Sequence, residues 1–128
     1  MSVIGTSLRV GLPLAALLAF PDASIGQPAP SFHASCGDLR AQMKKLGPIT
    51  DDVVTVIAVR GTLTIAEYDG TLAYMSVCKK PDPQVLCVTY GLSGRTIGND
   101  VVLTGTLARV GPDHIMLDPC LNSAPNRE

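Results

Sequence analysis

The sequence has few aromatic and few charged residues. Its 128 residues include no tryptophan, two phenylalanines and three tyrosines, and 16% of them are charged, with a net charge of −1. Single-stranded nucleic acids are bound by aromatic side chains in a positively charged groove, and anionic surfaces attract basic patches. Because the chain is poor in both features, we expect it to have no nucleic-acid partner.

No apolar run in the sequence is long enough to cross a membrane as a helix. The run at Val10–Phe20 has eleven residues, whereas a bilayer core needs about 20. It follows one basic residue, Pro21 closes it, and small residues precede Gln27, as in a secretory signal peptide. The alternative of a buried N-terminal helix fits Pro13 and Pro21 poorly. We therefore predict a signal peptide at 1–26, no membrane span in the mature chain, and a periplasmic or secreted location.

Four cysteines remain after the predicted cleavage, at Cys36, Cys78, Cys87 and Cys120. An even number of cysteines in a small exported domain indicates disulfides, because the oxidising compartment keeps them formed. Three pairings are possible. In a hairpin centred on Asp82-Pro83, Cys78 would face Cys87 with Cα atoms about 4.5 Å apart, within the range of roughly 4.4 to 6.8 Å that a disulfide requires. This geometry favours Cys78–Cys87, with Cys36 joined to Cys120.

No catalytic constellation is present in the sequence. The two histidines, His33 and His114, have no Ser, Cys or carboxylate at the spacing of a recognised motif. A metal at His33-x-x-Cys36, or at His114 and Cys120, would need thiolates that disulfides consume. We therefore predict a protein that is not an enzyme and that holds no metal and no cofactor.

A short helix is predicted near the start of the mature chain. Residues 27–34 contain two prolines and are expected to form an extended lead-in. Ser35 then suits the N-cap of a helix, and apolar residues recur at i, i+4 and i+7 from Leu39 to Leu46. Gly47-Pro48 ends the pattern, as expected at a helix C-terminus.

Beyond Val53 the apolar period changes from helical to two, which is typical of strands. In the first predicted strand, Ile57, Val59, Leu63 and Ile65 form one apolar face. The loop at 91–98 is expected to be mobile, and residues 122–128 to form a flexible tail. Five strands are predicted, at Val53–Ile65, Leu72–Cys78, Val85–Tyr90, Val101–Val110 and His114–Asp118.

Two of these strands share a pattern around a glycine in mid-strand. The segments Val59-Arg60-Gly61-Thr62-Leu63 and Leu103-Thr104-Gly105-Thr106-Leu107 each have an apolar residue two before the glycine and Leu two after it. A glycine in a strand marks a bend, and bent strands curl a sheet into a barrel. Five such strands, with the second and third joined as a hairpin, resemble the OB-fold over about Val53 to Leu117. The resemblance is to small exported OB-type domains.

The expected fold is therefore mainly β. It is a small five-stranded OB-like barrel with one short N-terminal helix, stabilised by disulfides, over residues 35–121. The eight residues of 91–98 leave little room for the helix often found between strands three and four of OB-type domains. Either the helix predicted at 35–46 caps a barrel end in its place, or the fold is a different small barrel.

The OB-fold resemblance implies a ligand site along the face of strands two and three and the loops beside it. For Tyr74 and Tyr90 on this face, we expect a role in packing rather than in ligand contact. We expect a monomeric binding or adaptor module for a protein, peptide or glycan. The alternative is a small inhibitor of an extracellular or periplasmic enzyme that inserts the 91–98 loop around Arg95 into a partner's cleft. The positions implied are Tyr74, Ser76, Val88 and Tyr90, with Tyr68 and Arg95 in flanking loops.

Overall fold

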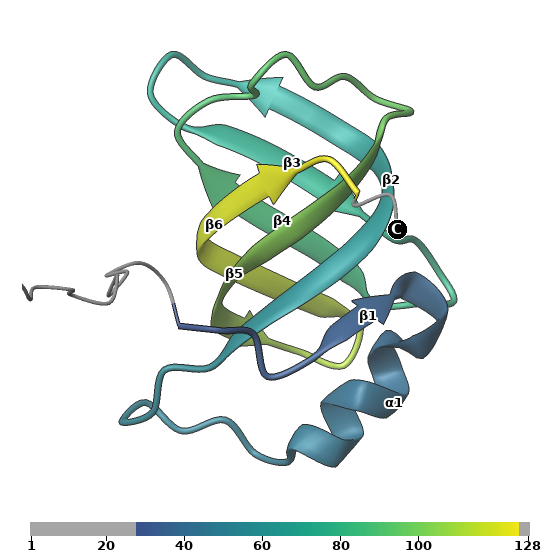
Figure 1. The fold of residues 1–128 in the computed structure, drawn as a ribbon, viewed down its shortest axis with the longest axis vertical. Coiled ribbons are helices and arrows are strands. Elements are labelled where there is room, and N and C mark those ends of the chain that lie inside the picture. The colour runs from purple at the N-terminus through teal and green to yellow at the C-terminus, as the bar shows by residue number, and fades with distance from the viewer. Residues whose placement is uncertain (1–27, 126–128) are drawn as a thin grey trace, which may run out of the picture.

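Five strands with alternating buried residues close into a barrel, and a helix lies beneath it (Figure 1). The computed structural model describes residues 28–125, so the signal peptide predicted at 1–26 lies outside the described residues. The mainly β barrel with one short helix is confirmed. The barrel strands are β2 (Val56–Tyr68), β3 (Ala73–Val77), β4 (Gln84–Thr89), β5 (Asp100–Val110) and β6 (His114–Ser123).

Strand β2 closes the barrel because it pairs with a different strand on each edge. The strand order is β2-β3-β4-β6-β5, and β5 pairs back to β2. Residues 56–62 of β2 pair with β5, and residues 63–68 pair with β3. The barrel pairings are antiparallel except that of β4 with β6, which is parallel. The glycine Gly61 lies where β2 changes from one partner to the other, as expected for a bend.

Aliphatic side chains and one cystine fill the barrel. The prediction that Ile65 points inward with the rest of its face is wrong. The pairing of β2 with β3 is irregular between Leu63 and Ile65, which reverses the alternation. Ala66 packs against the core in its place. The buried residues of the barrel strands in the core are Ile57, Val59, Leu63, Met75, Val77, Val85, Cys87, Val101, Leu103, Leu107, Ile115, Leu117 and Cys120.

Helix α1 (Cys36–Leu46) covers one end of the barrel. Its predicted bounds are confirmed: it follows Ser35, and it ends where the N–H of Gly47, at φ 81°, donates to the carbonyl oxygen of Met43. Leu39 is fully buried in the core. The helix therefore caps the barrel end, as expected, and contributes one anchoring side chain to the interior.

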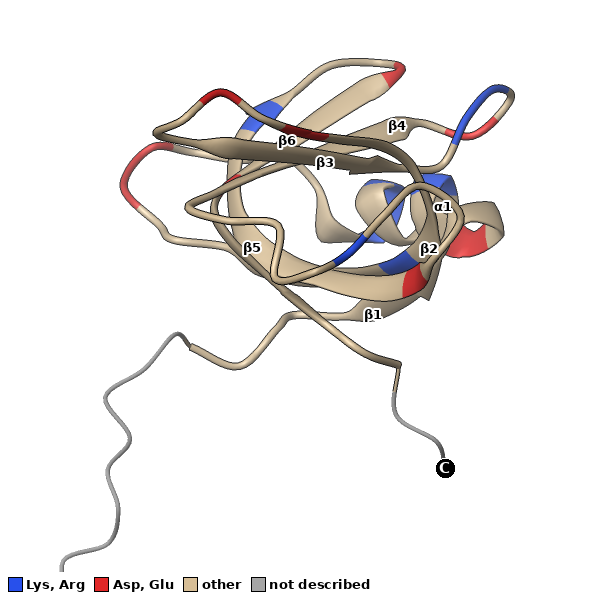
Figure 2. Cartoon of the chain, turned by 90° about the horizontal axis from the view of Figure 1, so that it is seen from above, with Lys and Arg blue, Asp and Glu red and all other residues tan. Residues whose placement is uncertain are grey.

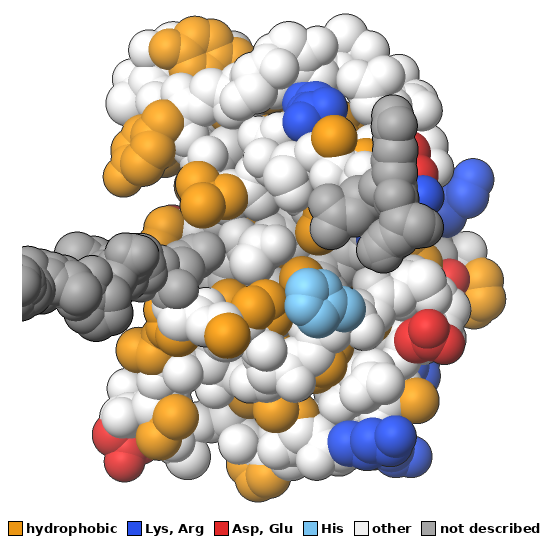
Figure 3. Space-filling model, viewed as in Figure 1, with side chains coloured by type: hydrophobic (Ala, Val, Ile, Leu, Met, Phe, Trp, Pro, Cys, Tyr) orange, Lys and Arg blue, Asp and Glu red, His pale blue; other side chains and the backbone are white. Residues whose placement is uncertain are grey.

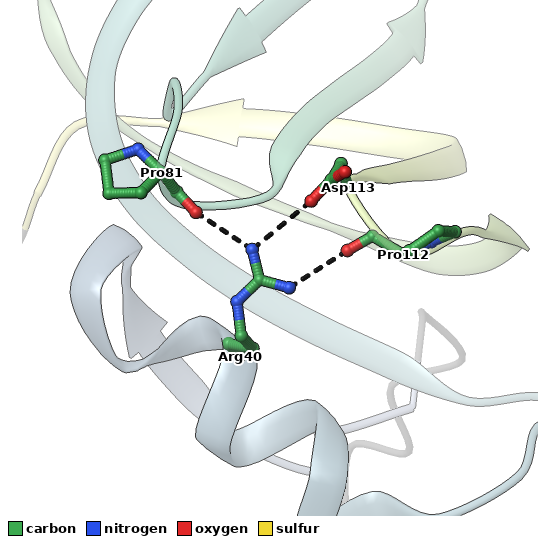
Figure 4. A network of polar contacts seen from close by, with 4 residues as sticks. All are labelled: Arg40, Pro81, Pro112 and Asp113. Atoms are coloured by element: carbon green, nitrogen blue, oxygen red, sulfur yellow. Dashed lines mark hydrogen bonds and ion pairs between the residues drawn. The ribbon is translucent and has the colours of Figure 1, made fainter.

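Arg40 ties α1 to both loops at this end of the barrel. Its guanidinium donates to the carbonyl oxygens of Pro81 at 2.9 Å and of Pro112 at 3.1 Å, and it contacts the carboxylate of Asp113 at 3.4 Å (Figure 4). Pro81 belongs to the loop between β3 and β4, and Pro112 to the turn between β5 and β6. One side chain thus holds the helix against two separate hairpins.

Strands β1 (His33–Ser35) and β3 lie one after the other along the same edge of β2. β1 pairs in parallel with β2, with His33 beside Ala58 and Ser35 beside Arg60. The opposite edge of this part of β2 is occupied by β5. The lead-in predicted at 27–34 therefore ends in a short paired strand, which places Cys36 next to the end of β3.

The two disulfides join Cys36 to Cys78 and Cys87 to Cys120, each with Cα atoms 5.4 Å apart. The presence of two disulfides is as predicted, but the predicted pairing of Cys78 with Cys87 and of Cys36 with Cys120 is wrong. One bridge joins the first residue of α1 to the residue that follows β3. The other joins β4 to β6 inside the barrel.

The register of the β3–β4 hairpin explains the different pairing. Val77 pairs with Val85, so the hairpin is centred on Pro81 and not on Asp82-Pro83. Cys78 therefore lies beyond the last paired residue, in the loop, whereas Cys87 lies within β4 and pairs with Met75. Two cysteines placed in this way do not face each other across the ladder.

Each mid-strand glycine lies against a segment that carries a cystine. A Cβ atom at Gly61 would lie 2.9 Å from the Sγ of Cys36. A Cβ atom at Gly105 would lie 2.5 Å from the carbonyl oxygen of Pro119 and 2.9 Å from the Cα of Cys120. These separations are too short for any residue with a Cβ atom. The two glycines therefore leave the space that the cystine-bearing segments occupy.

Strand β6 continues past its predicted end at Asp118. Pro119 lies at an irregularity in the pairing of β5 with β6, where its missing N–H interrupts no regular ladder. Cys120 then pairs with Gly105. The flexible tail predicted at 122–128 therefore begins within β6.

Gly105→Ala is expected to lower the free energy of unfolding by about 3 kcal/mol, because the added methyl group meets backbone atoms that cannot rotate away. Gly37→Ala is the control, since a Cβ atom there meets nothing within 4 Å, and alanine stabilises a helix relative to glycine by up to about 1 kcal/mol. Urea unfolding measures both variants. Equal stabilities would contradict the close packing at Gly105.

Candidate functional site

A row of outward-facing side chains crosses the barrel strands at one level and forms a groove. Along the row, Ile65 on β2 pairs with Ser76 on β3, which pairs with Leu86 on β4. Leu86 pairs with Met116 on β6, which pairs with Arg109 on β5. All five line a cavity of about 510 Å³, which we call the outer groove. Small-molecule and peptide sites have volumes of roughly 300 to 1,000 Å³.

The floor of the outer groove is apolar, and its polar groups bind one another. Ser76 is fully buried, lies between the core residues Met75 and Val77 on β3, and lines the outer groove. Its Oγ accepts a hydrogen bond from Nε2 of Gln84 at 3.3 Å, and its carbonyl oxygen accepts one from Oγ1 of Thr64 at 3.2 Å. An apolar ligand group would therefore cover no unpaired polar atom of this floor.

Two basic side chains line the outer groove, Arg109 from β5 and His114 from β6. Within residues 28–125, neither has an ion-pair partner. The carboxylate of the adjacent Asp113 contacts Arg40. The groove thus combines an apolar floor with a cation that is free to bind an anionic group.

The tyrosines of the predicted site lie away from the outer groove. The hydroxyl of Tyr68 donates to the carbonyl oxygen of Gly70 at 3.0 Å, and that of Tyr74 contacts Oδ2 of Asp69 at 3.5 Å, both at the β2–β3 turn. Tyr90 is 78% exposed. It follows the end of β4, which pairs with the start of β3, so the three tyrosines lie at the barrel end opposite α1 (Figure 1).

Two further predicted positions differ in their surroundings. Ser76 lines the outer groove, whereas Val88 is 8% exposed and does not line it. The role expected for Tyr90 in packing does not fit its exposure. The space-filling view shows apolar side chains in separate groups over the face of Figure 1 (Figure 3).

The 91–98 loop, expected to be mobile, is hydrogen-bonded to the barrel. The backbone N–H of Gly98 donates to the carbonyl oxygen of Leu63, and the N–H of Leu63 donates to that of Asn99. Nε of Arg95 donates to Oδ1 of Asn122 on β6 at 2.9 Å. This hydrogen bond therefore holds the Arg95 side chain against strand β6.

Sequence reasoning missed most of the outer groove, although one signal was available. Leu86 and Met116 each stand between two buried residues of the same strand, so these strands are apolar on both faces. A strand that is apolar on both faces has a second face to cover. The proximity of Arg109 and His114 depends on the β5–β6 register, which the sequence pattern does not specify.

Charged residues gather on no single face of the described chain (Figure 2). Among residues 28–125, no three His, Cys, Asp or Glu side chains are grouped in a way that could hold a metal ion. No helix in the same part of the chain is long and apolar enough to span a membrane.

The fold and the outer groove define a small mixed β-barrel with two disulfides and a candidate binding surface. No protein-family model matches the chain, and no curated protein shows significant sequence similarity to it.

The carboxylate of Asp69 holds the β2–β3 turn and is sensitive to acid. Its Oδ1 accepts hydrogen bonds from the backbone N–H groups of Leu72 at 2.8 Å and Thr71 at 2.9 Å. These bonds, that of Leu72 first, lower the pKa of Asp69 below its usual value.

The pKa of Asp69 predicts how the stability of the turn depends on pH. Because the folded-state pKa is lowered, the stabilisation is present above about pH 3.9, the pKa of an Asp in an unfolded chain, and is lost as the pH falls through the lower folded-state value. Asp69→Asn should remove this part of the acid dependence. Urea midpoints of both proteins across the acid range measure it, and identical pH profiles would show that the turn does not depend on the carboxylate.

Proposed function

We propose that the chain is an exported, non-catalytic binding module that holds a peptide segment in the outer groove. The observation that carries the proposal is the conjunction of an apolar floor, formed by Ile65, Leu86 and Met116, with the basic side chains of Arg109 and His114 at one site. Apolar pockets with a few convergent polar groups are the usual form of ligand sites.

The topology supports an OB-type assignment of the barrel. The last strand, β6, lies between β4 and β5, and β5 pairs back to β2, which is a five-stranded closed arrangement. OB-type domains bind ligands on the face of strands two and three, and the corresponding strands here are β3 and β4. These strands supply Ser76, Gln84 and Leu86 to the outer groove.

The chemistry of the outer groove favours a peptide with apolar side chains and a carboxylate. Apolar side chains would cover Leu86 and Met116, and the carboxylate would bind the guanidinium of Arg109, which forms strong bidentate contacts with such groups. A glycan is less well supported, because the tyrosines that could stack on sugar rings lie at the other end of the barrel.

Export is supported by the disulfides and by the predicted signal peptide. Two disulfides are consistent with an oxidising, extracytoplasmic location. The signal peptide at 1–26 remains a prediction from the sequence.

The alternative function, inhibition of an enzyme through the 91–98 loop, has less support. Insertion of Arg95 into a partner's cleft would require its guanidinium to leave the hydrogen bond with Asn122. The outer groove requires no such rearrangement.

The test uses a library of short acetylated apolar peptides, each prepared with a free and with an amidated C-terminus, and measures amide shifts of the full mature chain by NMR. Free-acid peptides should shift the amides of Leu86, His114 and Met116. Arg109→Gln should weaken the free-acid peptides about tenfold, which corresponds to about 1.4 kcal/mol, and leave the amidated ones unchanged.

A second variant tests the apolar floor of the outer groove. Met116→Asp places a carboxylate in the groove and should abolish binding of the free-acid peptides. Leu121→Asp is the matched control, because Leu121 lies on the same strand, is 60% exposed and is outside the groove. Equal binding by both variants, or shifts confined to Tyr68, Tyr90 and Arg95, would overturn the proposal.

A further inference from the structure

A second cavity of about 730 Å³ lies beside the Cys36–Cys78 disulfide. Both cysteines line it, together with Lys79 and Lys80 in the β3–β4 loop and Arg60 on β2. The sulfur bridge therefore forms part of a cavity wall, and the binding function proposed for the outer groove does not use it.

The two disulfides differ in how a thiol could reach them. Cys36 is partly exposed, whereas Cys78 is 6% exposed and packs in the core beside the cavity wall, so a thiol can reach the bridge through Cys36. Cys87 and Cys120 are 0% and 2% exposed and lie in the barrel core. Thiol–disulfide exchange requires direct attack of a thiolate on sulfur, so access separates an exchangeable bridge from a structural one.

The position of Cys36 on the helix favours its thiolate. Cys36 is the first residue of α1, a helix of 11 residues. At a helix N-terminus the unpaired backbone N–H groups and the helix dipole stabilise a negative charge, and cysteines there have a lowered pKa. Asp38 in the same turn opposes this effect, although its carboxylate already accepts a hydrogen bond from Ser35 at 3.0 Å.

The charges around the cavity add to the effect of the helix. Lys79 and Lys80 line the cavity, and Asp82 is the carboxylate in its wall. The guanidinium of Arg60 is bound to Asp100 at 2.8 Å. The wall around the sulfur bridge therefore carries two lysines and one carboxylate that is not paired with Arg60. This excess of positive charge favours the approach of an anionic thiolate.

We propose that the Cys36–Cys78 disulfide is a thiol–disulfide exchange site whose substrate is a dithiol or, in the reverse direction, a disulfide on another molecule. Cys36 is the sulfur that exchanges. Cys78 is the leaving group when the bridge is attacked, and in the reverse direction its thiolate resolves the mixed disulfide. Cys87–Cys120 stays intact and keeps the barrel closed.

The exchange balances in two steps. A thiolate of the dithiol attacks Sγ of Cys36, which forms a mixed disulfide and releases Cys78 as a thiolate that takes a proton from solvent. The second thiol, once deprotonated, attacks the external sulfur of the mixed disulfide, and Cys36 leaves as a thiolate. Two electrons pass from the dithiol, which becomes a disulfide, to the cystine, which becomes two thiols.

The backbone at Cys78 is compatible with release of the bridge. Cys78 has φ 74°, in the left-handed region that residues other than glycine rarely adopt. Arg40 still holds the same loop through the carbonyl oxygen of Pro81 after the sulfur bridge opens. Reduction therefore frees the Cys78 backbone while a second contact keeps the loop near α1.

The first test reduces the native mature chain with dithiothreitol and blocks free thiols by alkylation at increasing times, with circular dichroism of the same samples. Cys36 and Cys78 should be alkylated together while the β signal is unchanged, and Cys87 and Cys120 should stay oxidised until the protein unfolds. Simultaneous reduction of all four cysteines, or earlier reduction of Cys87–Cys120, would overturn the proposal.

The second test distinguishes an exchange site from a bridge that is only accessible. In Cys78→Ser, the free Cys36 should react with dipyridyl disulfide at about pH 6 at least tenfold faster than glutathione does, because a lowered pKa supplies more thiolate. Lys79→Gln/Lys80→Gln in the same background should slow the reaction several-fold. Lys44→Gln/Lys45→Gln, at the other end of α1, is the control and should leave the reaction rate unchanged. A rate equal to that of glutathione, or equal effects of both lysine pairs, would overturn the proposal.

Discussion

The barrel depends on two close approaches between chain segments, at Gly61 and at Gly105. The missing side chain of each glycine leaves space for a segment that carries a cystine. At Gly61, the start of α1 and the end of β3 meet along one edge of β2. At Gly105, the cystine-bearing part of β6 lies against β5. The bridges enclose sequence separations of 42 and 33 residues, for which the chain-entropy model gives about 4 kcal/mol each. This is a large share of a typical domain stability of about 5 to 15 kcal/mol.

The sequence predicted the elements well and their register poorly. The period-two pattern found the five strands, and the helix between Ser35 and Gly47 has the predicted bounds. Register depends on loop geometry, and the loop at 78–83 holds prolines that fit more than one turn centre. Because the predicted turn centre was wrong, the predicted disulfide pairing was wrong as well. The error at Ile65 has the same origin, since one irregularity in pairing moves a side chain to the other face.

The two sites lie next to each other at one end of the barrel. A smaller cavity of about 220 Å³ lies between the outer groove and the Cys36–Cys78 cavity and shares Gln84 and His114 with the first and Cys78 with the second. Neither site could be found from motif spacing, because each combines residues from distant parts of the chain. The OB-fold resemblance implied positions on β3 and on β4, and of these Ser76 lines the outer groove.

Peptide mapping of the unreduced, full mature chain determines which cysteines are joined at these two close approaches. Proteolysis under conditions that prevent thiol exchange, followed by mass spectrometry, identifies which cysteine peptides are linked. The structure predicts one linked pair that contains Cys36 and Cys78 and another that contains Cys87 and Cys120. Linkage of Cys78 to Cys87, or free thiols at any of the four positions, would contradict it.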